Sequence, residues 1–408
     1  MKINRNITLF IIGLLLFVVT GCGGNTSTNA RARTPISGEN LNWTIFRGDP
    51  SLSGHTTVSL PDNPVLLWTF ASDSRTRSSP IVYNGVTYWT DRNGRIFGVD
   101  INGELVFDLD LNIPFTEVQS VGSMPIRISG GTDATPMIYN SVMYLGILDG
   151  FMLAISLDTK EILWKFYTEG NISASANVVE FAGQTALVFG SYDNYFYVLN
   201  AATGEELSRF ASGHQINGAA GIWESHILFG GCDSWLRMID TQTGLLADEV
   251  ELRDYLPNSP AIIGNMAYVG DHDGNMYRLH LADGRIVRYD MIEHRDPDSG
   301  GFLSAPAVSS DAVFFFSGRQ LFAVNRANDS LRWSQLLRGN VRESAPVIAG
   351  DRIIACTLTG VVSIFDVNTG ELLWEYDIGE QIQASPAVVE GHFMILTARG
   401  TLLVFGNE

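Results

Sequence analysis

A dipeptide of the Ser/Ala-Pro type opens an apolar run eight times along the chain, at nearly constant spacing. The intervals between the second residues of successive dipeptides are 56, 40, 44, 40, 46, 40 and 40 residues. A repeat of about 40 residues built from short strands is typical of a propeller blade. Function must therefore be sought in a ring of repeats rather than in one catalytic core. The dipeptides are Ser79-Pro80, Thr135-Pro136, Ser175-Ala176, Ala219-Ala220, Ser259-Pro260, Ala305-Pro306, Ala345-Pro346 and Ser385-Pro386.

The seventh repeat shows the repeating unit most clearly. We expect strands over Ser344–Ile348, Arg352–Thr357, Val361–Phe365 and Glu371–Tyr376, because short β-branched and aromatic runs alternate there with Gly, Asn and Asp turns. Four strands so close in sequence form an antiparallel meander. Such a sheet cannot bury both faces alone, so neighbouring sheets must stack.

The last repeat begins at Ala384 and ends at Phe405, which leaves room for only three strands. The segment Val65–Phe70 has the outer-strand pattern of Leu372–Tyr376 and can supply the fourth strand. This pairing would remove two exposed sheet edges. The sequence therefore predicts an all-β, eight-bladed β-propeller with four-stranded antiparallel blades, closed by an N-terminal strand that joins the last blade.

A tryptophan recurs near the start of the outer strand. Trp164, Trp333 and Trp374 each lie four residues after the preceding turn position. This pattern resembles the tryptophan-docking repeat of quinoprotein-like (PQQ-like) β-propellers, and the segment that begins at Trp43 resembles their N-terminal segment. The resemblance covers about residues 43–405. Four repeats have another residue at the Trp position. Either these repeats have diverged in sequence, or the outer edge of the propeller is altered there to bind a partner. The four residues are Phe107, Ser208, Asp248 and Arg288.

The first 22 residues indicate export. Lys2 and Arg5 precede an apolar run of 13 residues, Ile7–Val19, which suits a signal-peptide core and is too short to span a bilayer. The small residues that end at Gly21 directly precede Cys22. This arrangement resembles the lipobox of bacterial lipoproteins and implies that Cys22 becomes the acylated N-terminus, for instance with palmitate. The alternative is an ordinary secretory signal followed by an incidental cysteine.

Composition divides the rest of the chain into a tether and a folded domain. We expect a lipoprotein signal peptide over 1–21, a lipidated flexible tether over 22–42 and the propeller over 43–408. The tether has almost no large apolar side chain and cannot offset the entropy of ordering. A lipid at Cys22 would hold the domain in the cell envelope, at the periplasmic face of the outer membrane. The outer face of the plasma membrane and the cell surface are the alternatives.

The net charge limits the classes of partner, and the cysteine positions argue against a disulfide. The chain has 26 basic and 44 acidic side chains, a formal net charge of −18, which argues against nucleic acid and an anionic membrane surface as main partners. Cys232 and Cys356 lie in repeats four and seven, too far apart around a ring to be bridged easily. We expect them to be buried, small apolar residues rather than reactive thiols.

Basic residues gather in the segments that precede the dipeptides. In a meander, these links lie on the same face as the turns between the second and third strands. The guanidinium group of arginine can form two parallel hydrogen bonds with a carboxylate, so this face is our candidate partner-binding surface. The alternative is that these are solvated loop residues paired with nearby carboxylates. The candidates are Arg75, Arg77, Arg127, Arg253, His294, Arg295, Arg338 and Arg342, of which Arg127 and the two residues 294 and 295 lie in the two longest links.

Two short motifs are interpreted as structural. Asp271–Asn275 resembles the start of a calcium loop, but its twelfth position is Ala282, where such a loop needs an acidic residue. We therefore expect a tight turn and no metal. Arg47-Gly48-Asp49 invites an adhesion interpretation, yet it belongs to the N-terminal segment that the family resemblance covers.

No catalytic motif appears in the sequence. The resemblance implies that enzymes of this superfamily use a quinone beside an adjacent cysteine pair, with calcium and a carboxylate base. This chain has no adjacent cysteines, and we expect no cofactor. Our leading hypothesis is a non-enzymatic, membrane-tethered scaffold that binds envelope proteins, similar in role to the propeller lipoproteins of outer-membrane β-barrel assembly. The alternatives are a quinone-dependent oxidoreductase and a polysaccharide-binding surface module.

Overall fold

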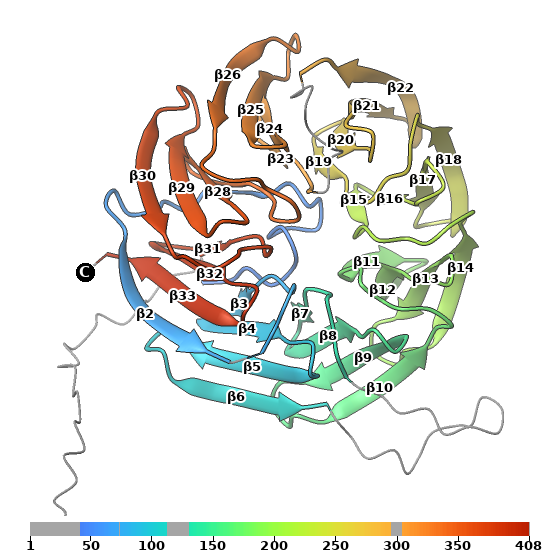
Figure 1. Ribbon diagram of the computed structural model, residues 1–408. Coiled ribbons are helices and arrows are strands. Elements are labelled where there is room, and N and C mark those ends of the chain that lie inside the picture. Colours follow the sequence, from blue (N-terminus) through green and yellow to red (C-terminus); the bar gives the residue numbers. More distant parts are fainter. Residues whose placement is uncertain (1–40, 73, 112–129, 295–303, 408) are drawn as a thin grey trace, which may run out of the picture. The chain divides into compact units, whose positions relative to one another are not determined.

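The computed structural model describes residues 41–72, 74–111, 130–294 and 304–407, all within the structural unit Ile36–Glu408. This unit is a ring of eight blades (Figure 1). Blades 1 to 4 contain β3 (Ile81–Tyr83), β4 (Val86–Thr90), β5 (Arg95–Asp100) and β6 (Leu105–Asp110); β7 (Met137–Tyr139), β8 (Val142–Gly146), β9 (Phe151–Ser156) and β10 (Ile162–Tyr167); β11 (Asn177–Phe181), β12 (Gln184–Gly190), β13 (Tyr195–Asn200) and β14 (Glu206–Ala211); and β15 (Gly221–Trp223), β16 (His226–Gly230), β17 (Trp235–Asp240) and β18 (Leu245–Glu251).

The second half of the chain completes the ring. Blades 5 to 7 contain β19 (Ala261–Ile263), β20 (Met266–Gly270), β21 (Met276–Ala282) and β22 (Arg285–Ile292); β23 (Ala307–Val308), β24 (Ala312–Ser317), β25 (Gln320–Asn325) and β26 (Leu331–Leu336); and β27 (Val347–Ala349), β28 (Arg352–Cys356), β29 (Val361–Asp366) and β30 (Leu372–Asp377). Blade 8 contains β31 (Ala387–Val389), β32 (His392–Leu396), β33 (Thr401–Gly406) and, from the N-terminal part, β2 (Val65–Ala71). The short β1 (His55–Thr56) pairs in parallel with β27.

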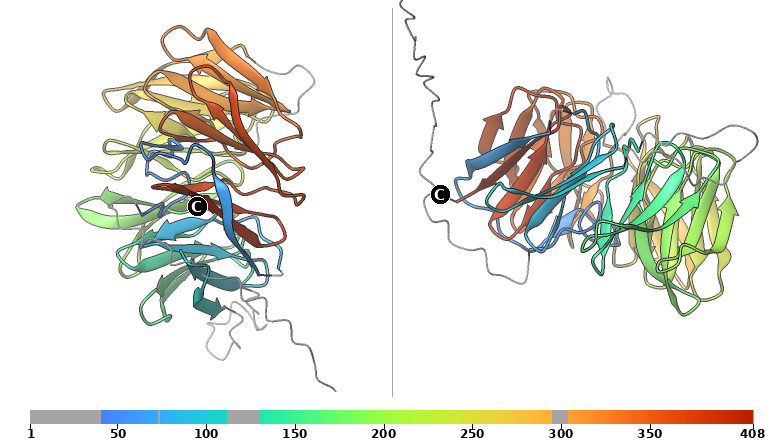
Figure 2. Two further views of the ribbon diagram at one scale, coloured as in Figure 1. Left: turned by 90° about the vertical axis from the view of Figure 1, so that its left-hand side faces the viewer. Right: turned by 90° about the horizontal axis from the view of Figure 1, so that it is seen from below.

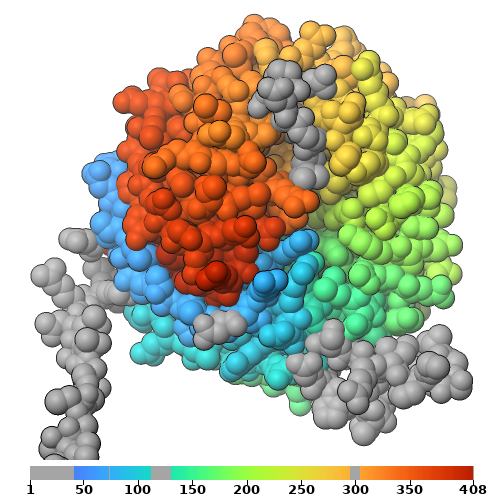
Figure 3. Space-filling model, in the orientation of Figure 1, coloured from blue at the N-terminus to red at the C-terminus, as the bar shows by residue number. Residues whose placement is uncertain are grey.

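The predicted ring closure is confirmed. β2 pairs antiparallel with β33, from Val65 opposite Gly406 to Ala71 opposite Thr401. In Figure 2 and in the space-filling view of Figure 3, the blue N-terminal strand lies against the red C-terminal strands at the rim. The fold class inferred from the repeats, an all-β propeller of eight four-stranded antiparallel blades, is therefore the observed one.

The hydrophobic core lies between blades rather than within them. Each of the seven buried clusters in the described residues joins neighbouring blades, for example Phe196 of blade 3 with Phe229 of blade 4, whose rings stack with centroids 4.1 Å apart. The largest cluster spans blades 7, 8 and 1 and so includes the closure by β2. This arrangement explains why a single sheet of this sequence cannot be stable alone.

Every outer strand carries a β-bulge at the same place. In blade 2, Ile162 pairs with Ile155 and Trp164 with Ala154, so Leu163 is the extra residue. A bulge re-aims the side chain that follows it. Here it turns the tryptophan towards the next blade, and the indole N–H of Trp164 donates to the carbonyl of Ala201, 3.0 Å away. Trp68 and Trp333 make the equivalent bonds to the carbonyls of Ile101 and Val367, at 2.8 and 3.1 Å.

The four repeats without a tryptophan have substitute contacts. Lys160 lies over the ring of Phe107 at 4.9 Å, which joins blades 1 and 2. Phe181 lies against Gly244 at the junction between blades 3 and 4, and His226 lies against Gly284 at the junction between blades 4 and 5. Between blades 5 and 6, Arg278 donates to the carbonyl of Arg326 (3.4 Å), at the position equivalent to Ala201, and to the carboxylate of Asp329 (2.5 Å). Each altered junction therefore has its own contact.

Candidate functional site

The segment from Trp43 to Leu60, here called the threading segment, runs inside the ring and bonds to the innermost strands. Trp43 exchanges two backbone hydrogen bonds with Val82 of blade 1, both 2.8 Å. Its later carbonyls accept amide protons from the same strand position of other blades: Thr44 from Ile138, Pro50 from Ile222, Ser51 from Ile262, Ser53 from Val308 and Gly54 from Ile348, at 2.8–2.9 Å. In blade 3 the side chain of Asn177 donates to the carbonyl of Pro50 instead, at 2.8 Å. The segment therefore fills the edges that the inner strands leave unpaired.

Arg47 is the most buried charged side chain of this segment, with 1% of its surface exposed. Its guanidinium donates to the carbonyl of Pro346 at 2.8 Å and to that of Pro306. Burial lowers the Arg47 pKa to about 9, and the nearby Asp49 carboxylate partly opposes this effect. Burial also raises the pKa of Asp49, although the hydrogen bonds that Asp49 accepts from Ser53 act in the opposite direction. The Arg47-Gly48-Asp49 sequence is thus an interior element, in agreement with its structural interpretation.

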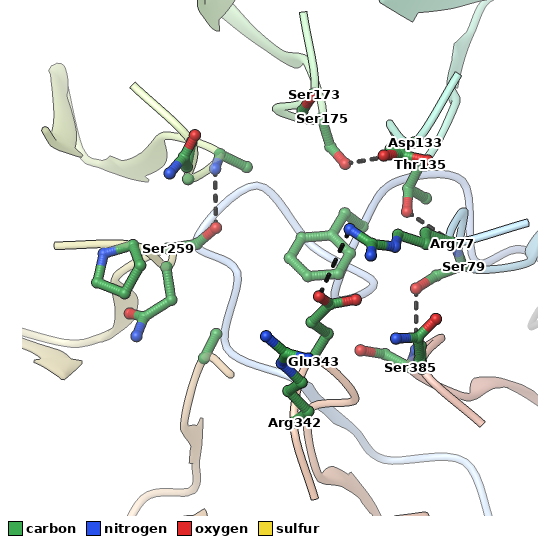
Figure 4. Close-up of a pocket in the computed structure, with 18 of the residues that line it drawn as sticks. Arg77, Ser79, Asp133, Thr135, Ser173, Ser175, Ser259, Arg342, Glu343 and Ser385 are labelled. Atoms are coloured by element: carbon green, nitrogen blue, oxygen red, sulfur yellow. Dashed lines mark hydrogen bonds and ion pairs between the residues drawn. The ribbon is translucent and has the colours of Figure 1, made fainter. Parts of the chain in front are cut away.

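Hydrogen bonds around the axis join the repeated dipeptides at five of the eight blade junctions. The first residue of a dipeptide accepts, through its hydroxyl, the backbone N–H of the corresponding residue in the preceding blade (Figure 4). The hydroxyls and amides pair as follows: Thr135 with Ser79 at 2.9 Å, Ser175 with Thr135 at 3.2 Å, Ser259 with Ala219 at 2.8 Å, Ser385 with Ala345 at 2.9 Å and Ser79 with Ser385 at 2.9 Å. The Ser/Thr position of these five repeats therefore marks a junction between blades, and the other three repeats have Ala at this position.

These hydroxyls line a cavity of roughly 320 Å³ at the centre of the face where the links meet, here called the funnel. Phe46 of the threading segment also lines it. The funnel residues come from all eight blades: Phe46, Arg77, Ser79, Asp133, Thr135, Ser173, Ser175, Tyr192, Asn217, Gly218, Ala219, Pro257, Asn258, Ser259, Ala305, Arg342, Glu343, Gln383 and Ser385.

Charged side chains of blades 1, 2 and 7 lie at one side of the funnel. The Arg77 guanidinium points towards Glu343, with 3.8 Å between nitrogen and carboxylate oxygen (Figure 4). Arg92 forms a two-pronged pair with Asp133, at 2.6 and 2.5 Å, and this hydrogen bond raises the pKa of Arg92. Arg342 is exposed and also lines the funnel.

The predicted partner-binding residues that the structure describes do not form one cluster. Of these, only Arg77 and Arg342 line the funnel, whereas Arg75 and Arg253 are exposed elsewhere along the links. Arg338 pairs with Glu375 of the next blade at 2.5 Å, and His294 bonds through Nε2 to the carbonyl of Asp329 at 2.9 Å. Arg338 is thus paired with a carboxylate, whereas His294 bonds to a backbone carbonyl. Arg127, Arg295 and the lipidation residue Cys22 lie outside the described residues.

Sequence reasoning missed part of the funnel. It treated the dipeptide hydroxyls as strand starts, although Ser or Thr at the first position in five of eight repeats is a signal for a repeated bond. It also missed the pairing of Arg92 with Asp133, because these residues are 41 positions apart and belong to different blades. Only the ring geometry brings them together.

The remaining predictions concern cysteines and metals. Cys356 is buried and Cys232 half-buried, both are free, and burial raises their thiol pKa values to about 12 and about 11. Asp271 is buried and accepts bonds from Asn275 and Tyr277, as a turn residue does. Among the described residues no group of three or more His, Cys, Asp and Glu side chains is arranged to hold a metal ion. No helix in this part of the chain is long and apolar enough to cross a membrane.

Comparison with known proteins identifies the family. The family model described as "Outer membrane protein assembly factor BamB" matches residues 66–290 and 291–406. The chain belongs to this family. Curated members from Shewanella oneidensis and Legionella pneumophila are 22% identical over 352 residues and 25% identical over 192 residues. The first match covers 81% of this chain and 85% of the relative, and the second covers 44% and 48%, about half the length of that relative.

Solved structures agree on the fold. BamB from Moraxella catarrhalis superposes with a TM-score of 0.66 at 16% identity, covering 85% of this chain and 98% of that one. A europium-containing methanol dehydrogenase superposes with a TM-score of 0.72 at 10% identity, covering 90% and 98%. Because both identities are low, these similarities concern the propeller fold alone. The BamB family thus shares its architecture with enzymes.

Proposed function

We propose that this chain is a lipid-anchored, non-enzymatic propeller scaffold that binds cell-envelope proteins during the assembly of outer-membrane β-barrels. The observation that carries the proposal is membership of the BamB family over residues 66–290 and 291–406. The lipobox-like sequence before Cys22 supports attachment to the periplasmic face of the outer membrane. The net charge of −18 is consistent with protein partners rather than nucleic acid.

The funnel residues do not fit the cofactor of the enzymes with this fold. Those enzymes are expected to hold a quinone beside two adjacent cysteines and a calcium ion beside a carboxylate base. Here the three cysteines, Cys22, Cys232 and Cys356, are far apart in sequence. The two carboxylates that line the funnel, Asp133 and Glu343, each face an arginine. The separated cysteines and the arginine-paired carboxylates therefore favour a binding role over quinone chemistry.

The partner surface that we propose is the face where the links between blades meet. Arg75 and Arg253 are exposed on this face and can form two-pronged bonds with the carboxylates of a partner. Such rim charges mainly set the rate and specificity of association. Long links on a rigid scaffold are also where binding residues concentrate.

Co-purification from gently solubilised envelopes tests the proposal. We expect the tagged full chain to recover barrel-assembly components, and the double variant Arg75→Glu, Arg253→Glu to recover several-fold less because it repels the same carboxylates. Arg285→Glu is the matched control, since Arg285 is exposed and follows a turn on the opposite face. A Cys22→Ala variant should move from the membrane to the soluble fraction. Failure of the wild-type chain to recover any assembly component under native conditions would refute the scaffold role.

A further inference from the structure

We propose that the funnel is a binding site for a sugar acid, that is, a small monocarboxylate with several hydroxyl groups. This site lies at the centre of the face that we propose for partner binding, and it goes beyond the scaffold role because its ligand is a small molecule. Its size, its charge and its hydrogen-bonding groups each restrict the ligand.

Size restricts the ligand to one small molecule or to the end of a chain. The volume of roughly 320 Å³ lies at the lower limit for small-molecule pockets. The threading segment crosses the ring below, bonded to blades on several sides, and Phe46 lines the cavity. The funnel is therefore blind, and a folded domain cannot enter it.

Charge restricts the ligand to a monoanion. Arg92 and Asp133 neutralise each other through their two-pronged pair, which leaves Arg77 and Arg342 against the single carboxylate of Glu343. The 3.8 Å contact between Arg77 and Glu343 is too long for a hydrogen bond, so the Arg77 fork can still bind an acceptor. A guanidinium fork matches a carboxylate. The one excess positive charge at the funnel matches a single negative charge on the ligand, whereas the second charge of a phosphate dianion would have no cation left to pair with.

The hydrogen-bonding groups favour a ligand with hydroxyls. Each funnel hydroxyl that accepts a backbone N–H, such as Ser79 or Ser385, retains its own proton for a ligand oxygen. The carboxylate of Glu343 lines the funnel and, among the described residues, has only the 3.8 Å contact with Arg77, so it can accept from a ligand hydroxyl. Phe46 adds an apolar surface for the C–H face of a sugar ring. Hydroxyl groups both donate and accept, and they satisfy both requirements.

Titration calorimetry on the purified full chain tests this site with glucuronate as the probe. We expect saturable binding of one glucuronate, at least about tenfold weaker binding of neutral glucose, and no tighter binding of glucose 6-phosphate. A short oligogalacturonate should bind with one chain per protein if the funnel takes a polysaccharide end. Free sugar acids are the ligand if only the monomer binds.

Two variants locate the binding. Arg77→Gln and Arg342→Gln should each weaken glucuronate binding about tenfold, because each removes a charge-assisted hydrogen bond. Both side chains are exposed, so the thermal unfolding temperature should remain that of the wild type, which the same samples can verify. Arg285→Gln, on the opposite face, should bind normally. The proposal is overturned if glucuronate does not bind saturably, if glucose binds equally well, or if both funnel variants bind as the wild type does.

Discussion

At the scale of single residues, the buried Arg47 holds the centre of the ring together. Burial of a guanidinium is unfavourable unless its donors are satisfied. Here it bonds to the carbonyls of Pro306 and Pro346, the second residues of two repeated dipeptides in neighbouring blades. Gly54 leaves the space that the guanidinium occupies, since a Cβ there would lie 2.0 Å from its Nη2 atom.

Replacement of Gly54 by Ala tests this packing. Gly54 has a φ of +64°, so the variant suffers both backbone strain and collision with Arg47, and we expect a loss of about 2–4 kcal/mol in the free energy of unfolding. Gly183→Ala is the matched control, because Gly183 has a φ of +78° and open space around its Cβ position. It should lose only about 1 kcal/mol. Equal losses in urea unfolding would show that contact with Arg47 is unimportant.

Residue-scale contacts were the least predictable part of the site. The sequence indicates that Arg47 belongs to the N-terminal segment of a propeller family, but its partners lie 259 and 299 positions away. The exposed arginines singled out from the sequence likewise mixed funnel residues, such as Arg77, with rim residues, such as Arg338, whose carboxylate partner belongs to the next blade. Pairing across blades depends on the ring, which no local pattern encodes.

At the scale of elements, the strand pattern was predictable because alternating apolar residues and Gly/Asn/Asp turns are local signals. The strands of the seventh blade, β27 to β30, follow the expected runs to within a few residues at each end. The substitute contacts at the junctions without tryptophan were not predictable. They use side chains from other strands, such as Phe181 of β11 and Arg278 of β21, whose roles become visible only when blades stack.

The junction between blades 5 and 6 should be sensitive to acid. The hydrogen bond from Arg288, with a further one from Arg278, holds the pKa of Asp290 below its usual value of 3.8. A lowered pKa in the folded state means that Asp290 stabilises the fold above the usual pKa, and that this contribution is lost as the pH falls through the lower, folded value. Asp290→Asn should therefore be less stable than the wild type near neutrality and approach it below about pH 3.

Urea unfolding at a series of pH values measures this difference. Asp273→Asn is the matched control, since Asp273 is an exposed carboxylate in a turn of the same blade. It should follow the wild type at every pH. A stability gap between Asp290→Asn and the wild type that stays constant from neutral to acidic pH would contradict the proposed role of the ion pairs.

At the scale of the whole molecule, two N-terminal segments complete the propeller. The threading segment satisfies the inner edges of the blades, and β2 supplies the outer strand of blade 8. Closure by β2 was predictable, because the repeats and the strands within each repeat can be counted along the sequence, and this count shows that the last repeat lacks its fourth strand. The path of the threading segment could not be predicted, since its bonds involve backbone atoms with no sequence preference.

Closure by β2 positions the funnel and the proposed partner surface, so every functional inference depends on it. Hydrogen–deuterium exchange of Thr401–Gly406, in the wild type and in a variant that lacks Val65–Ala71, tests the closure together with thermal unfolding. We predict that the deletion exposes the amides of β33 that face β2, accelerates their exchange and lowers the unfolding temperature, since it opens two sheet edges. Unchanged exchange and an unchanged unfolding temperature would contradict the closed ring.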